Sequence, residues 1–295
     1  MSRLTTRLLF ALVVSAMVSA CGRGEAPGPP VATATVTFSK PRVALGSPVE
    51  ITYKFQVAAN APAFDQDYRV FVHFLDADEE RIWTDDHDPV VPTSQWKPGQ
   101  KVQYTRTVFM PIFPYQGEAT VTMGLYNGPT FENRLPLTGE GKGREYPVAK
   151  LELLPQSENI YLTFREGWNS LEMAADAPAR EWQWMKKTGT LAFRNPKQNV
   201  TLYLETDGRP DLFPGAPQVV TLFVNGVQAH QFTMDHKDPV LRRLPISAAQ
   251  LGTGETVEIK LDSDKAFVPA QRPGLGGDPR ELSIRVYHAF VEAAK

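Results

Sequence analysis

The sequence predicts an all-β protein with two antiparallel β-sandwich domains. Two observations support this fold class. Apolar and polar residues alternate with a period of two in many short runs, which is the pattern of strands with one buried face. Turn-forming clusters rich in glycine, proline and asparagine separate these runs. With 295 residues, of which 42% are hydrophobic and 10% aromatic, the chain is large enough to build two cores.

The N-terminus has the features of an export signal. Arg3 and Arg7 precede an apolar run over residues 8–20, which ends at Val18-Ser19-Ala20-Cys21. The run is shorter than the roughly 20 residues that a membrane-spanning helix needs, and small residues precede the cysteine. This ending resembles the lipobox of bacterial lipoproteins, which implies cleavage before Cys21 and a diacylglyceryl anchor on it. We therefore expect a cleaved lipoprotein signal peptide over 1–20, and the lipidated cysteine with a flexible tether over 21–31.

The same features predict where the protein resides. Cys21 is the only cysteine, so its modification would leave no thiol for a disulfide, a nucleophile or a zinc site. Gly22 stands where lipoproteins retained in the inner membrane carry aspartate, so the resemblance favours the outer membrane, facing the periplasm. The formal net charge is −2 with no basic block, which argues against a nucleic-acid partner. We expect a cell-envelope protein attached to the membrane through lipid alone.

The first domain is expected over residues 32–155. Alternation is clear over residues 49–57, and the run 68–75 is apolar on both faces apart from Arg69 and His73, as in a central strand. An acidic turn then leads into a returning strand over 81–84. About seven short strands in this span predict an immunoglobulin-like sandwich.

The second domain is expected over residues 156–295 and repeats the strand pattern. Asn225-Gly226 favours a type I′ hairpin turn, because both residues tolerate positive φ. Residues 247–251 form the one segment that suggests a helical turn. This pattern predicts a second sandwich of jelly-roll type.

Catalytic motifs are not evident. The chain has no HExxH or GxSxG sequence, and Gly139-Glu140-Gly141-Lys142-Gly143 lacks the spacing and the hydroxyl residue of a phosphate loop. We expect a protein that is not an enzyme and needs neither a cofactor nor a metal ion.

The densest polar cluster runs from Asp85 to Asp88 and contains His87. Trp83 precedes it and Trp96 follows. The cluster fits three alternatives: carboxylates that cap a turn, contacts to sugar hydroxyls beside a tryptophan ring, or a divalent-cation site.

The second domain holds a further aromatic group. Trp182 and Trp184 lie two residues apart and would share one face of a strand, either as a sugar-stacking platform or as part of the core. Trp168 lies nearby in the sequence. The candidate ligand contacts are therefore Trp83, Asp85, Asp86, His87, Asp88, Trp96, Trp168 and Trp182.

Two resemblances accompany these patterns. Through Gly46-Ser47-Pro48-Val49 and Val70-Phe71-Val72-His73-Phe74, the first half resembles the immunoglobulin-like carbohydrate-binding domains of transporters that export O-antigen polysaccharide. The second half is similar to β-sandwich accessory domains of bacterial polysaccharide-assembly proteins. The residues that carry this second resemblance are Gly167-Trp168, Glu172, Trp184, Phe267-Val268-Pro269 and Asp278-Pro279-Arg280-Glu281-Leu282, with Ser283 in place of the usual glycine.

These observations predict a non-catalytic, lipid-anchored envelope protein that binds glycan or polysaccharide through its sandwiches. The alternative is a tethered scaffold that docks an envelope protein in biogenesis or secretion. A glycan-cleaving enzyme is the third hypothesis, although nothing in the sequence places two carboxylates across a cleft.

Overall fold

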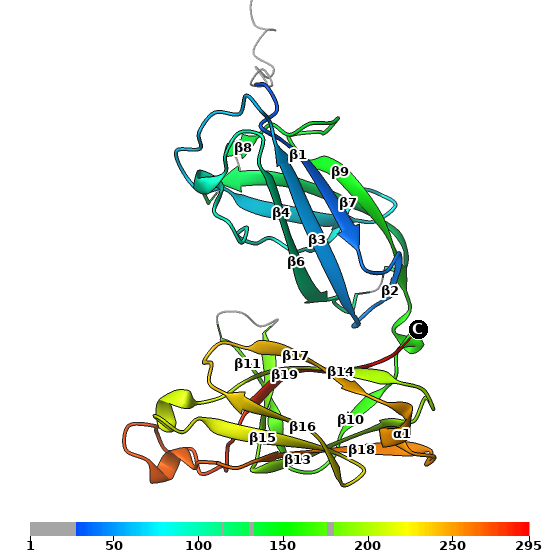
Figure 1. The fold of residues 1–295 in the computed structure, drawn as a ribbon, viewed down its shortest axis with the longest axis vertical. Helices are drawn as coiled ribbons and strands as arrows, with labels where there is room; N and C mark the ends of the chain where they lie inside the picture. The colour runs from blue at the N-terminus through cyan, green and yellow to red at the C-terminus, as the bar shows by residue number, and fades with distance from the viewer. Residues whose placement is uncertain (1–27, 114, 130–132, 176–179, 295) are drawn as a thin grey trace, which may run out of the picture. The chain divides into compact units, whose positions relative to one another are not determined.

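The computed structural model describes residues 28–113, 115–129, 133–175 and 180–294. The expected signal peptide and Cys21 lie outside these residues, as does most of the tether. The chain is all-β and divides into two compact units, the first built mainly from β1–β9 and the second mainly from β10–β19 (Figure 1). This confirms the predicted fold class. Among the described residues, no helix is long and apolar enough to cross a membrane.

The first unit has two sheets. One has the order β1-β3-β6, and the other has the order β2-β9-β7-β4-β5 with β8 paired to β7. The strands are β1 (Ala32–Phe38), β2 (Arg42–Ala44), β3 (Pro48–Val57), β4 (Arg69–Leu75), β5 (Arg81–Thr84), β6 (Lys101–Phe109), β7 (Gly117–Asn127), β8 (Asn133–Leu135) and β9 (Tyr146–Leu154). The β2–β9 pair is parallel, a departure from the expected antiparallel pattern.

The core of the first unit is rich in aromatic side chains. Tyr53 and Phe55 of β3 are fully buried, and the Phe55 ring lies 4.9 Å from that of Trp96. Phe38 of β1 contacts Phe74 of β4, with ring centroids 6.2 Å apart. The side chains of alternate β4 residues therefore pack between the two sheets, and the intervening ones face outward.

The second unit also has two sheets, with the orders β10-β13-β18-β15-β16 and β11-β12-β19-β14-β17. The strands of the first are β10 (Leu162–Phe164), β13 (Thr188–Arg194), β18 (Thr256–Ser263), β15 (Gln218–Val224) and β16 (Val227–Met234). Those of the second are β11 (Trp168–Met173), β12 (Glu181–Met185), β19 (Arg285–Ala293), β14 (Val200–Asp207) and β17 (Val240–Ile246). One aliphatic core fills the space between them, and its fully buried members include Leu202, Leu222 and Ile259.

Two local predictions in the second unit are confirmed. Asn225 and Gly226 join β15 to β16 with φ angles of 46° and 83°, as a type I′ turn requires. The helical turn is α1 (Ala248–Leu251), which Ser247 caps through a reciprocal capping box with Gln250. The remaining helical pieces are 3₁₀ turns at Thr93–Gln95, Gln156–Glu158, Pro210–Leu212 and Pro269–Gln271.

Candidate ligand-binding pocket

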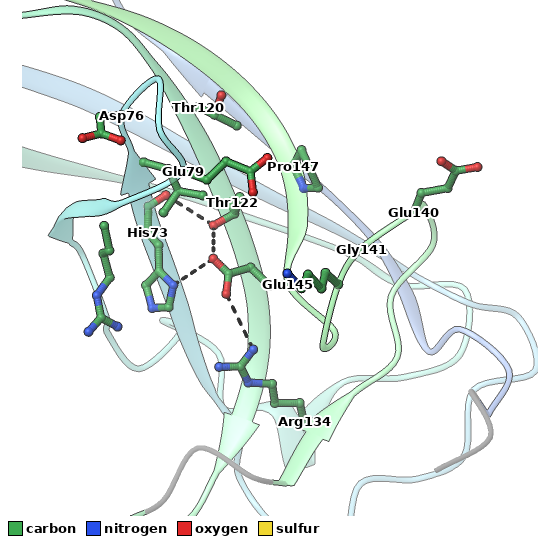
Figure 2. A pocket seen from close by; sticks show the side chains of 13 residues that line it. His73, Asp76, Glu79, Thr120, Thr122, Arg134, Glu140, Gly141, Glu145 and Pro147 are labelled. Atoms are coloured by element: carbon green, nitrogen blue, oxygen red, sulfur yellow. Dashed lines mark hydrogen bonds and ion pairs between the residues drawn. The ribbon is translucent and has the colours of Figure 1, made fainter. Parts of the chain in front are cut away.

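A pocket of about 860 Å³ lies on the first unit, over the face of the β4–β7 pair that points away from the β1-β3-β6 sheet (Figure 2). The register pairs His73 with Thr122 and Leu75 with Thr120, so these four side chains lie on one face. The segment from β8 to the start of β9 passes over the same face and supplies Arg134 and Glu145. The hairpin between β4 and β5 supplies Asp76, Glu79 and Arg81 at the rim.

Glycine allows the covering segment to approach the sheet. A Cβ added to Gly124 of β7 would lie 2.7 Å from the carbonyl oxygen of Arg144 and 2.3 Å from the Phe71 ring. Both distances are too short for a side-chain carbon, so residue 124 must be glycine for β7 and the covering segment to approach this closely. The Arg134 guanidinium lies 4.5 Å from the centre of the Phe71 ring and donates to the Gly143 carbonyl at 2.9 Å. One side of the pocket is therefore tightly packed.

Glu145 connects the covering segment to the sheet. Its Oε1 accepts hydrogen bonds from His73 Nδ1 at 3.0 Å and from Thr122 Oγ1 at 2.6 Å, and its Oε2 lies 3.7 Å from Arg134 (Figure 2). The hydrogen bond from His73 is the main cause that lowers the Glu145 pKa to about 2, and Thr122 and the charge of Arg134 act in the same direction. The carboxylate is therefore ionised at neutral pH.

The ionised carboxylate fixes the role of one ring nitrogen of His73. A carboxylate only accepts, so Nδ1 carries a proton and donates it to Glu145. His73 is only 5% exposed, and Nε2 is buried with no hydrogen-bond partner. A buried polar atom without a partner costs about 1–3 kcal/mol. His73 thus carries one unsatisfied nitrogen, which is closed off from the pocket.

Six of the eight residues expected from the sequence lie elsewhere in the first unit. The side chain of Asp85 is buried, and it accepts from Tyr53 Oη at 2.7 Å and from two guanidinium nitrogens of Arg106 at 3.0 and 3.2 Å. His87 Nδ1 donates to the Asp85 carbonyl at 2.7 Å, and Nε2 accepts from Tyr104 Oη at 2.8 Å. Burial lowers the His87 pKa, which keeps the ring neutral in this arrangement. The structure thus places both residues as anchors of the sandwich interior.

The other members of this cluster are also used structurally. Asp86 Oδ1 accepts the Val72 amide at 3.1 Å, and Asp88 pairs with Arg69 on the surface at 2.9 Å. Trp96 is 4% exposed and donates to the Val91 carbonyl, so it belongs to the core rather than to a ligand surface. Trp83 is half-buried against Phe74, with ring centroids 4.5 Å apart. Within the described ranges, no group of three or more His, Cys, Asp or Glu residues could hold a metal ion.

The tryptophans of the second unit do not form an open platform. Trp182 and Trp184 share a face, but the Arg285 guanidinium lies over both rings, 5.2 and 5.4 Å from their centres. Arg285 is itself held by Asp207, so the cation covers the surface that a sugar would need. Trp168 packs against Phe164, and its Nε1 donates to the Thr190 carbonyl at 2.9 Å.

No protein-family model and no curated protein sequence matches the chain. Solved structures give distant similarities. One is the alkylpurine DNA glycosylase AlkC of Pseudomonas fluorescens bound to DNA, at 11% identity over 42% of this chain and 30% of that one, with a TM-score of 0.28. Two come from ZmpB of Clostridium perfringens. The M60 catalytic domain with CBM51-1 and CBM51-2 matches at 7% identity over 91% of this chain and 32% of that one, with a TM-score of 0.29. The CBM51-2 and INT domains with GlcNAc match at 9% identity over 86% and 41%, with a TM-score of 0.22. The chain spans less than half the length of each of these three.

Proposed function

We propose that the protein binds glycan through the pocket on its first unit and does not catalyse a reaction. The observation that carries this proposal is an open pocket whose wall is built around Glu145, which His73, Thr122 and Arg134 hold in place. A pocket of about 860 Å³ is within the size range of small-ligand sites, which is roughly 300–1,000 Å³. Its lining combines hydroxyl, imidazole, guanidinium and carboxylate groups, each of which hydrogen-bonds readily to sugar hydroxyls.

The proposal includes a location. The Val18-Ser19-Ala20-Cys21 sequence supports cleavage before Cys21 and lipid on its sulfur. Two or more acyl chains on that cysteine would hold the protein at a membrane stably, because one chain alone gives only marginal binding. We propose that the mature protein is displayed from the outer membrane into the periplasm, where it would meet envelope polysaccharide.

Binding to a printed glycan array and to purified bacterial envelope polysaccharides tests the proposal. The purified protein should bind at least one glycan class, and Glu145→Gln should weaken that binding because Glu145 orients His73 and Arg134. A matched control is Glu258→Gln, which changes a carboxylate on β18 of the second unit. Binding that is unaffected by Glu145→Gln would exclude this pocket, and no binding to any glycan would exclude the function.

A further inference from the structure

The second unit contains a pocket of its own, with a volume of about 620 Å³. It lies among the loops that carry the sequence resemblance of this half, because Phe267, Val268 and Glu281 line it. Phe213 and Arg272 line it as well. Its size is within the range of small-ligand sites, which is roughly 300–1,000 Å³. The pocket of the first unit uses none of these residues, so the proposed function gives this second pocket no role.

Two phenylalanine rings and one carbonyl hold the guanidinium of Arg272. Its Cζ lies 4.9 Å from the centre of the Phe213 ring and 6.0 Å from that of Phe267, distances at which a cation is attracted to a ring face. One of its terminal nitrogens, Nη1, donates to the Leu212 carbonyl at 3.1 Å. Phe267 is in turn fixed by two backbone hydrogen bonds of 2.8 Å with Leu282. The guanidinium is therefore oriented before any ligand binds.

Arg272 differs from two other arginines that these loops hold in place. Arg209 is paired with Asp211, and Arg280 is paired with Asp278. Within the described part of the chain, no carboxylate is paired with Arg272, and its one side-chain hydrogen bond goes to a backbone carbonyl. A guanidinium has five N–H donors in a fixed planar fork. Most donors of this half-buried side chain are therefore available to a ligand that enters the pocket.

The charges around the pocket favour a ligand with a single negative charge. Three cations and two carboxylates line it: Lys187, Lys265 and Arg272, with Asp264 and Glu281. Lys265 is paired with Asp264 at 2.5 Å, and Glu281 Oε1 accepts the backbone amide of Lys187 at 2.7 Å. One positive charge is left over. A carboxylate balances it, whereas a doubly charged phosphate group would leave an excess of negative charge beside Glu281.

The remaining lining points to the rest of the ligand. An arginine fork binds both oxygens of a carboxylate through two parallel hydrogen bonds, but that group alone would fill little of the pocket. Gln271 and Glu281 can hydrogen-bond to ligand hydroxyls, and Phe213 and Val268 supply apolar surface. A sugar acid combines one carboxylate with several hydroxyls and an apolar ring face.

We infer that the second unit binds a saccharide that bears a carboxylate, and that Arg272 holds the carboxylate. Arg272 contacts the ligand directly in this assignment, and the rings of Phe213 and Phe267 position its guanidinium. The inference is independent of the proposed function, because the two pockets share no residue.

Calorimetric titration compares a hexuronic-acid oligosaccharide with a neutral oligosaccharide of the same length and with inorganic phosphate. The uronic-acid compound should bind at least about tenfold more tightly than the neutral one, because a charge-assisted pair is lost in the latter. Its affinity should fall as salt rises from roughly 0.1 M to 1 M. Equal affinity for the acidic and neutral compounds, or tighter binding of phosphate, would overturn the inference. That result would leave the proposed function standing if Glu145→Gln still weakened glycan binding.

Variants of Arg272 test the residue itself. Arg272→Gln removes the charge and Arg272→Lys keeps it without the fork, so both should weaken binding of the uronic-acid compound at least about tenfold. The matched control is Arg194→Gln on β13, an exposed arginine of the same unit, which should bind normally. Normal binding by either Arg272 variant would refute the assignment.

A measurement on the unaltered protein decides the matter if the Arg272 variants do not fold. The NMR signal of the Arg272 side-chain Nε–H should move when the uronic-acid compound is added, because the guanidinium gains a carboxylate partner. A signal that stays in place at saturating compound would refute the assignment.

Discussion

Replacement of Asp85 by alanine tests whether the acidic cluster is a structural anchor. Asp85 accepts the hydroxyl of Tyr53, which is fully buried, and two nitrogens of Arg106. Alanine would leave the Tyr53 hydroxyl without an acceptor, at a cost of about 1–3 kcal/mol. Arg106 is 38% exposed and regains water, so the loss of its pairing adds less than about 1 kcal/mol. We expect the free energy of unfolding to fall by about 3 kcal/mol.

A double-mutant cycle with Tyr53→Phe isolates the hydrogen bond. Tyr53→Phe alone should cost about 1 kcal/mol, because the Asp85 carboxylate keeps Arg106. The double variant should cost about 2 kcal/mol rather than the sum of about 4, since no hydroxyl is then left unsatisfied. Equilibrium unfolding in urea, followed by tryptophan fluorescence, measures each value. If Asp85→Ala costs less than about 0.5 kcal/mol and abolishes glycan binding, Asp85 is a ligand contact and our assignment is wrong.

Three further predictions concern acid stability, backbone strain and the anchor. The Glu145 pKa is lowered from 4.5 to about 2. About 2 kcal/mol of stability should therefore be present above pH 4.5 and lost as the pH falls to about 2. In acid denaturation curves, Glu145→Gln should remove this pH dependence. Gly167→Ala should destabilise the folded protein by at least about 2 kcal/mol, because φ is +83° and a Cβ would lie 1.9 Å from the Thr188 carbonyl oxygen. Gly277→Ala is the control. Gly277 has open space around it, so this variant should be nearly neutral in the same urea titration. Cys21→Ser should abolish lipid attachment and release the protein from membranes, and an intact mass that retains the leader in the unaltered protein would contradict the lipobox assignment.

The sequence predicts most of the fold because its strand signals are local. Alternation and turn residues act within a few positions, so the strand 81–84 and the Asn225-Gly226 hairpin match their predicted places. Long-range partners decide the rest. Asp85 and His87 read as ligand candidates because the partners that bury them, Tyr53 and Tyr104, lie 32 and 17 residues away.

The candidate pocket was missed for the same reason. His73 is separated from Glu145 by 72 residues, and Glu145 follows a glycine-rich stretch with no strand or motif signal of its own. The one local sign was a histidine in an otherwise apolar strand. Such a residue commonly indicates a satisfied core histidine, and only the missing partner at Nε2 distinguishes this one.

Packing alone does not explain the polar group at position 73. Phe71 and His73 lie on the same face of β4, and Phe71 is fully buried beneath Arg134. An apolar side chain at position 73 would continue that packing, and the replacement of both partners of a buried hydrogen bond by apolar groups can be nearly neutral or stabilising. The His73–Glu145 pair therefore brings little to stability that packing could not supply, and it leaves one buried nitrogen without a partner.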